Sequence, residues 1–241
     1  MACEGKNLDL SAKTFDEFVE FFFARDVVYC EPPLNDIVAD VVEIGQDYDE
    51  AVPSSPEVLI EHMTRLFSEF GQIAPRYSLA QINRGIWTIL GPGLELPDLL
   101  WDPAIPFSRR LQCIRSMYHV YSDFVAKSDV NVTENCFGMW WDLVAHDFWF
   151  QGRLWEAGIQ MGDVSKLDAE VRTLLDAMFE TLKRILELPD PRTQVCAMHG
   201  LGHLHHPAVR ETVQEFIENH KSEFTEEHIR WLEECRDGTV M

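Results

Sequence analysis

Four histidines fall within the stretch MHGLGHLHHP, residues 198–207, and imidazole is a common metal ligand in proteins. His199 and His203 are four residues apart, so on a helix both rings lie on one face, where they could bind a single zinc ion. A metalloprotease HExxH motif also needs a glutamate after the first histidine, and this position holds Gly200. Two ligands are also fewer than the three that catalytic zinc sites take from the protein. We therefore expect a helix and its end, with histidines that face a groove or the core and hold no metal.

A second candidate for metal chemistry is the pair His146-Asp147, which resembles the HD dipeptide of metal-dependent phosphohydrolases. That family also needs a histidine upstream and an aspartate well downstream, and a match of two letters is common by chance. The sequence contains no GxSxG, P-loop, GxGxxG or EF-hand motif. A metal-dependent hydrolase built on His146, Asp147 and the His199/His203 pair is therefore the alternative function, and whether the chain is an enzyme stays open.

Apolar residues recur at helical spacing in almost every segment, whereas period-2 alternation over the length of a strand is hard to find. The pattern predicts an all-α protein. Thr14 and Glu17 form a capping box, and Asp190-Pro191 and Thr225 are typical helix starts. We expect the third helix to stop at Gly71. The expected helices lie at about 14–23, 34–42, 54–70, 77–90, 107–127, 134–148, 168–188, 191–205, 208–219 and 226–236.

The segments QVCAMHGLGHL and AVRETVQEFIENH, joined by a turn at Pro207, resemble a helix pair of a HEAT-like α-solenoid. The resemblance covers residues 190–236. It implies an irregular antiparallel helical bundle or HEAT-like solenoid of about ten helices, folded as a single domain over residues 1–241. Gly200 and Gly202 each disfavour a helix, so their presence in the first segment suggests close approach of a neighbouring helix backbone.

Three predicted helices begin with loosely similar sequences, namely AQINRGIWTIL, TENCFGMWWDL and TQVCAMHGLGHL. They are separated by 54 and 59 residues, which is too long for one HEAT unit each, so any solenoid is irregular. In a solenoid these helices could line one concave face. The residues that we expect to bind a ligand there are Arg84, Trp87, Trp140, Asp142, His199 and His203.

Charge distinguishes this chain, since 41 acidic against 20 basic residues give a formal net charge of −21. Residues 1–70, which carry the predicted N-terminal helices, hold 16 acids and 4 bases. The negative electrostatic field of these charges repels nucleic acid and anionic membranes and speeds encounter with a basic protein. A need for solubility alone would also explain the excess of acidic residues. Six scattered cysteines without a CxxC pair favour a reducing cytoplasm. The polar N-terminus does not resemble a signal peptide, and no apolar run reaches the roughly 20 residues that span a bilayer.

Together these patterns favour a cytoplasmic binding or adaptor protein with a protein or peptide partner, a basic one among the options, and with no cofactor. They favour neither nucleic acid nor membrane as a partner. A third function class is an acidic inhibitor or immunity-type protein that neutralises a basic partner with the carboxylates of residues 1–70.

Overall fold

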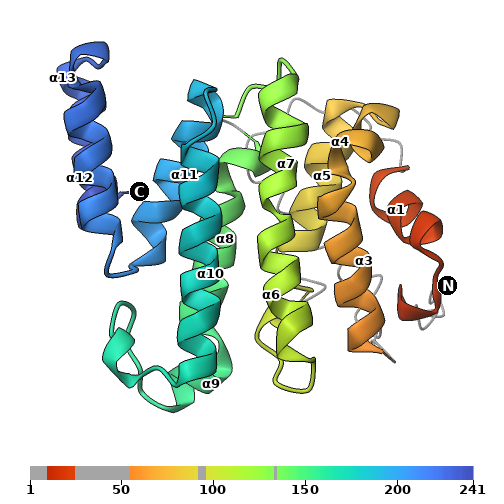
Figure 1. The fold of residues 1–241 in the computed structure, drawn as a ribbon. Helices are drawn as coiled ribbons and strands as arrows, with labels where there is room; N and C mark the ends of the chain where they lie inside the picture. Colours follow the sequence, from red (N-terminus) through yellow and green to blue (C-terminus); the bar gives the residue numbers. More distant parts are fainter. Residues whose placement is uncertain (1–9, 25–54, 92–95, 133–134, 241) are drawn as a thin grey trace, which may run out of the picture. The chain divides into compact units, whose positions relative to one another are not determined.

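The computed structural model describes residues 10–24, 55–91, 96–132 and 135–240 (Figure 1). Over these ranges the chain forms helices and short 3-10 segments and contains no strand, which confirms the predicted all-α class. Within the same ranges, no helix is both long and apolar enough to cross a membrane. The helix expected at 34–42 lies outside the described residues. Contacts divide the chain into two compact units, residues 1–119 and 120–241, which are described separately. The single domain stays a prediction.

Unit 1 is built from helices that bury one apolar face each. In α1, Phe18 and Phe23 are almost fully buried, and Phe23 packs so closely on α5 that a Cβ at Gly85 would lie 2.3 Å from its ring. The described elements are η1 (Leu10–Ala12), α1 (Phe15–Phe23), α3 (Pro56–Ser68), α4 (Phe70–Ile73), η2 (Ala74–Arg76), α5 (Leu79–Leu90), η3 (Leu96–Leu100) and α6 (Phe107–Ser116).

Two capping boxes start helices in unit 1. The Thr14 hydroxyl accepts a hydrogen bond from the Glu17 amide, and the Glu17 carboxylate accepts one from the Thr14 amide at 2.8 Å, as the sequence predicts. Ser78 and Gln81 form the same box at the start of α5. Each box satisfies amides that a helix start otherwise leaves unpaired. The second box explains why α5 begins at Leu79, two residues after the predicted position.

Two predicted helix bounds are wrong. The segment 107–127 is not one helix, because α6 ends at Ser116 and is followed by α7 (Tyr118–Asp123) and η4 (Val125–Lys127). At the break, the Ser116 hydroxyl donates to the Cys113 carbonyl at 2.6 Å, a side-chain bond that competes with the helical ladder. The third helix ends at Ser68, and Gly71 lies inside α4. One glycine costs a helix only about 1 kcal/mol, so it does not stop a helix by itself.

Unit 2 is organised around α11 (Pro191–Leu204), which packs against α8 (Cys136–Phe150), α10 (Ala169–Leu186) and α13 (Glu226–Asp237). The glycines of α11 mark the closest approaches, as predicted. A Cβ at Gly200 would lie 2.4 Å from Trp141 Cβ, and a Cβ at Gly202 would lie 3.1 Å from Cys235 Cα. The remaining elements are α9 (Gly152–Glu156), η5 (Val164–Lys166), α12 (Val209–His220) and η6 (Lys221–Glu223).

Candidate functional site

His199 and His203 lie on one face of α11, as their spacing predicts. Their Nε2 atoms are 3.1 Å apart, their ring centroids are 4.6 Å apart, and the ring planes are nearly perpendicular at 86°. Both side chains are partly exposed, because this face of α11 is covered only in part. The structure therefore brings two imidazoles together at an accessible position.

The second ring nitrogen of each histidine faces an acceptor on α8. His199 Nδ1 is 3.1 Å from the carbonyl oxygen of Gly138, and His203 Nδ1 is 3.5 Å from Asp142 Oδ1. The side chains of His203 and Asp142 are 23% and 27% exposed. Burial lowers the pKa of His203, with the Asp142 carboxylate acting in the opposite direction, so the neutral imidazole is favoured near neutral pH. We call His199, His203 and Asp142 the His–Asp cluster.

The other two histidines of the stretch have structural roles. The His206 ring stacks on Phe179 with centroids 4.3 Å apart, its Nδ1 accepts from the Ala208 amide at 3.1 Å, and its Nε2 is 3.0 Å from Asp176 Oδ1. His205 ends α11 in the left-handed conformation at φ 51°, and its ring packs against the backbone of Gly238. Burial lowers the pKa of His205. These contacts lie around the end of α11, and we assign both residues to packing there.

The other predicted ligand-binding residues are Trp140 in unit 2 and Arg84 and Trp87 in unit 1. Trp140 is fully buried and packs edge-on against Tyr121, with centroids 6.3 Å apart, so it belongs to the core of unit 2 and we leave it out of the site. Arg84 and Trp87 are half-buried on α5, in unit 1. A concave face that would join them to the His–Asp cluster therefore stays a prediction.

The HD dipeptide is placed on α8. His146 is exposed and stacks on Phe150, with centroids 4.5 Å apart, one helical turn after Asp142. Within the described part of the chain, no three His, Cys, Asp or Glu side chains gather into a group that could hold a metal. The described residues therefore do not include the converging metal ligands that a phosphohydrolase site needs.

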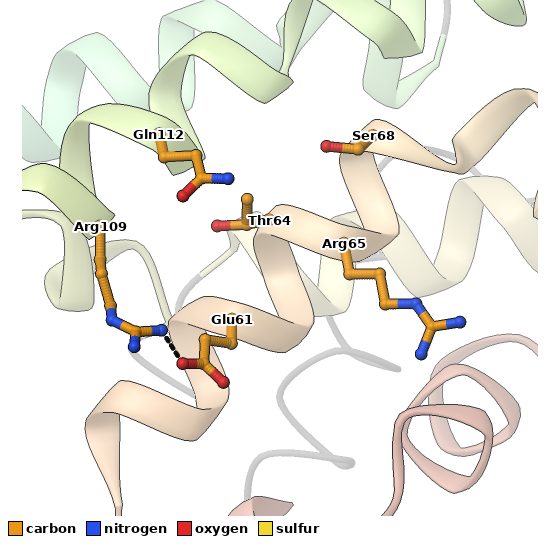
Figure 2. Close-up of a pocket in the computed structure, with 6 residues that line it drawn as sticks. All are labelled: Glu61, Thr64, Arg65, Ser68, Arg109 and Gln112. Atoms are coloured by element: carbon orange, nitrogen blue, oxygen red, sulfur yellow. Dashed lines mark ion pairs between the residues drawn. The ribbon is translucent and has the colours of Figure 1, made fainter.

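A hollow that the sequence analysis did not identify lies between α3 and α6 in unit 1 (Figure 2). Its volume is about 340 Å³, and its polar lining includes two arginines. Arg109 pairs with Glu61 across the hollow, and Arg65 of α3 pairs at 2.9 Å with Glu69, the residue that follows this helix. Both positive charges are thus compensated by the chain itself, and the hollow does not resemble an anion site. The lining residues are Glu61, Thr64, Arg65, Ser68, Arg109 and Gln112.

Two residues of the α8/α11 surface were not predicted. Gly138 contributes only its carbonyl, which every residue possesses, so no sequence signal could have identified it. Val195 lies one turn before His199 and is 42% exposed, which is unusual for a valine in a helix of the core. Its place in the stripe Val195, His199 and His203 follows from helical spacing alone.

The comparisons with known proteins add no relative from which a role could be transferred. No protein-family model matches the chain, and searches of curated proteins and of solved structures find no match either. Any functional assignment therefore depends on the chain's own residues.

Proposed function

We propose that this chain is a binding protein that holds a basic segment of a partner protein on the surface formed by α8 and α11. The observation that carries the proposal is the His–Asp cluster, a polar network that keeps Asp142 and His203 about one quarter exposed while joining two helices. The network leaves the Asp142 carboxylate partly accessible to solvent, where a basic group of a partner can reach it.

The surroundings of the cluster favour a mixed polar and apolar contact. Val195 exposes an apolar side chain one turn before His199, and interfaces combine apolar anchors with a few placed polar groups. Residues 120–241 contain 22 acidic and 11 basic residues, so unit 2 carries a formal net charge of −11. That charge favours encounter with a basic partner.

The HEAT-like resemblance supports the same proposal. α11 and α12 follow one another across the turn at Pro207, and α11 also packs on α13, which is the local arrangement that stacked helical repeats use to present a binding surface. The acidic-inhibitor function is a separate candidate, because it assigns the contact with a basic partner to the carboxylates of residues 1–70. Much of the charge on which it depends falls in residues 25–54, outside the described residues. The metal-dependent hydrolase has less support, because His146 is exposed and stacks on Phe150.

Site-specific photo-crosslinking in a native lysate tests the proposed surface. A photoreactive residue at position 195 should form an adduct with one partner, identified by mass spectrometry, and the same residue at Thr173 on the exposed side of α10 is the matched control. Asp142→Asn should reduce the adduct, and rising salt should reduce it too, because exposed charges are screened over roughly 8 Å at physiological ionic strength. Equal adducts from both positions, or an adduct indifferent to Asp142→Asn and to salt, would contradict the proposal.

A further inference from the structure

Two aromatic side chains where α8 is followed by α9 are exposed to solvent. Trp155 is 68% exposed and Phe150 is 46% exposed. The tryptophans of α8 lie instead in the core, since Trp140, Trp141 and Trp149 are at most 2% exposed. Aromatic rings contribute much of the apolar area that a contact buries, so two neighbouring exposed rings mark a contact surface.

The exposed rings belong to a row of three. The His146 ring stacks on Phe150 with centroids 4.5 Å apart and planes 24° apart, and the Phe150 centroid lies 6.4 Å from that of Trp155 with planes 34° apart. We call His146, Phe150 and Trp155 the aromatic ladder. His146 covers part of the Phe150 ring, and the exposed fractions of Phe150 and Trp155 leave ring surface open to a partner.

The aromatic ladder continues the surface that carries Asp142. His146 and Phe150 follow Asp142 by about one and two turns of α8, and each step shifts the side chain by only about 40° around the helix. At about 1.5 Å per residue, Phe150 lies about 12 Å along the helix axis from Asp142. An extended segment of about four residues covers this length, so one partner segment can contact both.

The charges around the aromatic ladder determine the kind of group that it can bind. Residues 136–156, which include α8 and α9, hold three acidic residues and one basic residue. The basic residue, Arg153, lies two positions before Trp155 and therefore about 160° away around α9. Exposed rings can also stack on nucleic-acid bases, but the negative charge of unit 2 repels the phosphates. A cation is the group that both the rings and the carboxylates attract.

From this arrangement we infer that the aromatic ladder receives an arginine side chain of the partner, whose guanidinium group stacks on the exposed faces of Phe150 and Trp155. A guanidinium group is planar and weakly hydrated, whereas the ammonium group of lysine is compact and strongly hydrated, so arginine suits an exposed ring better. The inference rests on the proposed function, because it gives the basic segment a second contact beyond Asp142 and specifies the residue type at that contact. The arginine is expected about 12 Å from the basic residue that meets Asp142.

Titration of the full chain with hexa-arginine and with hexa-lysine, followed by calorimetry at low salt, tests the inference. Trp155→Leu should weaken hexa-arginine binding by about 2- to 5-fold, the loss expected for one exposed cation–π contact, and should weaken hexa-lysine binding less. Phe150→Leu should act in the same direction. Leu79→Ala on α5, at a side chain as exposed as Phe150, is the control and should leave both affinities unchanged.

Asp142→Asn in the same titration separates this inference from the proposed function. A loss of affinity with Asp142→Asn but not with Trp155→Leu would overturn the inference and leave the proposed function standing. A loss with Trp155→Leu but not with Asp142→Asn would support the inference and contradict the role of the His–Asp cluster. Equal losses for the two peptides with Trp155→Leu, no saturable binding of hexa-arginine, or comparable binding of a short oligothymidine strand would overturn the inference.

The indole N–H signals of the ¹⁵N-labelled wild-type chain give a second readout of the contact. The chain has seven tryptophans, and the Trp155 signal is the one that is missing from the spectrum of Trp155→Leu. Hexa-arginine should shift this signal and leave the signals of the buried Trp140 and Trp141 in place. A Trp155 signal that does not move at saturation would overturn the inference.

Discussion

Replacing Gly200 by alanine adds a single methyl group at the tightest contact of α11. The new Cβ would lie 2.4 Å from Trp141 Cβ, 2.9 Å from Leu182 Cδ2 and 3.0 Å from Trp141 Cγ. Leu182 can move by rotating its side chain. The Cβ of Trp141 cannot, because it moves only with the backbone of α8. The substitution therefore forces two packed helices apart.

The expected change in the free energy of unfolding can be worked from three terms. Alanine is favoured over glycine in a helix by about 1 kcal/mol, and burial of the methyl group adds about 0.8 kcal/mol of stability. Carbon atoms in contact prefer about 3.5–4.0 Å, so the contact with Trp141 Cβ is short by more than 1 Å. Overpacking costs about 1–3 kcal/mol and more where the backbone must shift, so we take about 4 kcal/mol. The net effect is a destabilisation of about 2 kcal/mol.

Urea denaturation followed by tryptophan fluorescence measures this change, because Trp140, Trp141 and Trp149 all lie on α8. With a slope of about 2 kcal/mol per M, the midpoint should fall by about 1 M. Val195→Ala is the matched control on the exposed side of the same helix and should change the stability by less than about 0.5 kcal/mol. A Gly200→Ala variant as stable as the wild type, or more stable by the helix-propensity gain, would refute the packing argument.

Three further predictions concern the ends of α11. Burial lowers the pKa of His205 below its ordinary value of 6.5, so the unfolded chain binds the proton first and stability should fall as the pH drops from about 7 to about 5. His205→Asn, which tolerates the left-handed conformation, should flatten that part of the profile in urea titrations at each pH. Trp149→Phe removes an indole donor 3.0 Å from the buried Leu204 carbonyl and should cost about 1–3 kcal/mol, measured by urea denaturation followed by circular dichroism. Arg192→Ala breaks contacts with Asp190 and with the Ser128 carbonyl and should lower the free energy of unfolding by about 1–2 kcal/mol in the same assay. This figure is discounted for solvent screening, because the Arg192 side chain is 32% exposed. An unchanged urea midpoint would exclude a role for these contacts in stability.

Local signals predicted most of the helix bounds. The Thr14/Glu17 box starts α1, Pro191 opens α11 with the Asp190 side chain as its cap, and the Thr225 hydroxyl accepts from an amide at the start of α13. These signals are sufficient because a helix start is decided by a few neighbouring side chains. The break at Met117 is different. It depends on how Ser116 competes for a backbone carbonyl, and a serine in a helix more often points to solvent.

The candidate site was predicted in part, because helical spacing reports on one helix at a time. The spacing of four places His199 and His203 on one face of α11, and Asp142 was selected from a helix with a similar start. That α8 and α11 pack against one another is tertiary information, and so is the partner of each Nδ1 atom. The sequence analysis therefore placed both histidines on one face, whereas the structure shows which groups of α8 they meet.

Helical spacing separates Trp140 from Asp142 on α8. Two residues apart on a helix, their side chains point about 160° from one another around the axis, so they face opposite sides of α8. Asp142 and Gly138 are four residues apart and lie within about 40°, which is why both meet α11 at its histidines. The same period places Trp140 on the opposite side of α8, where it is fully buried. Helical spacing could thus choose between the two residues of α8, and only the packing of α8 on α11 shows which histidines they meet.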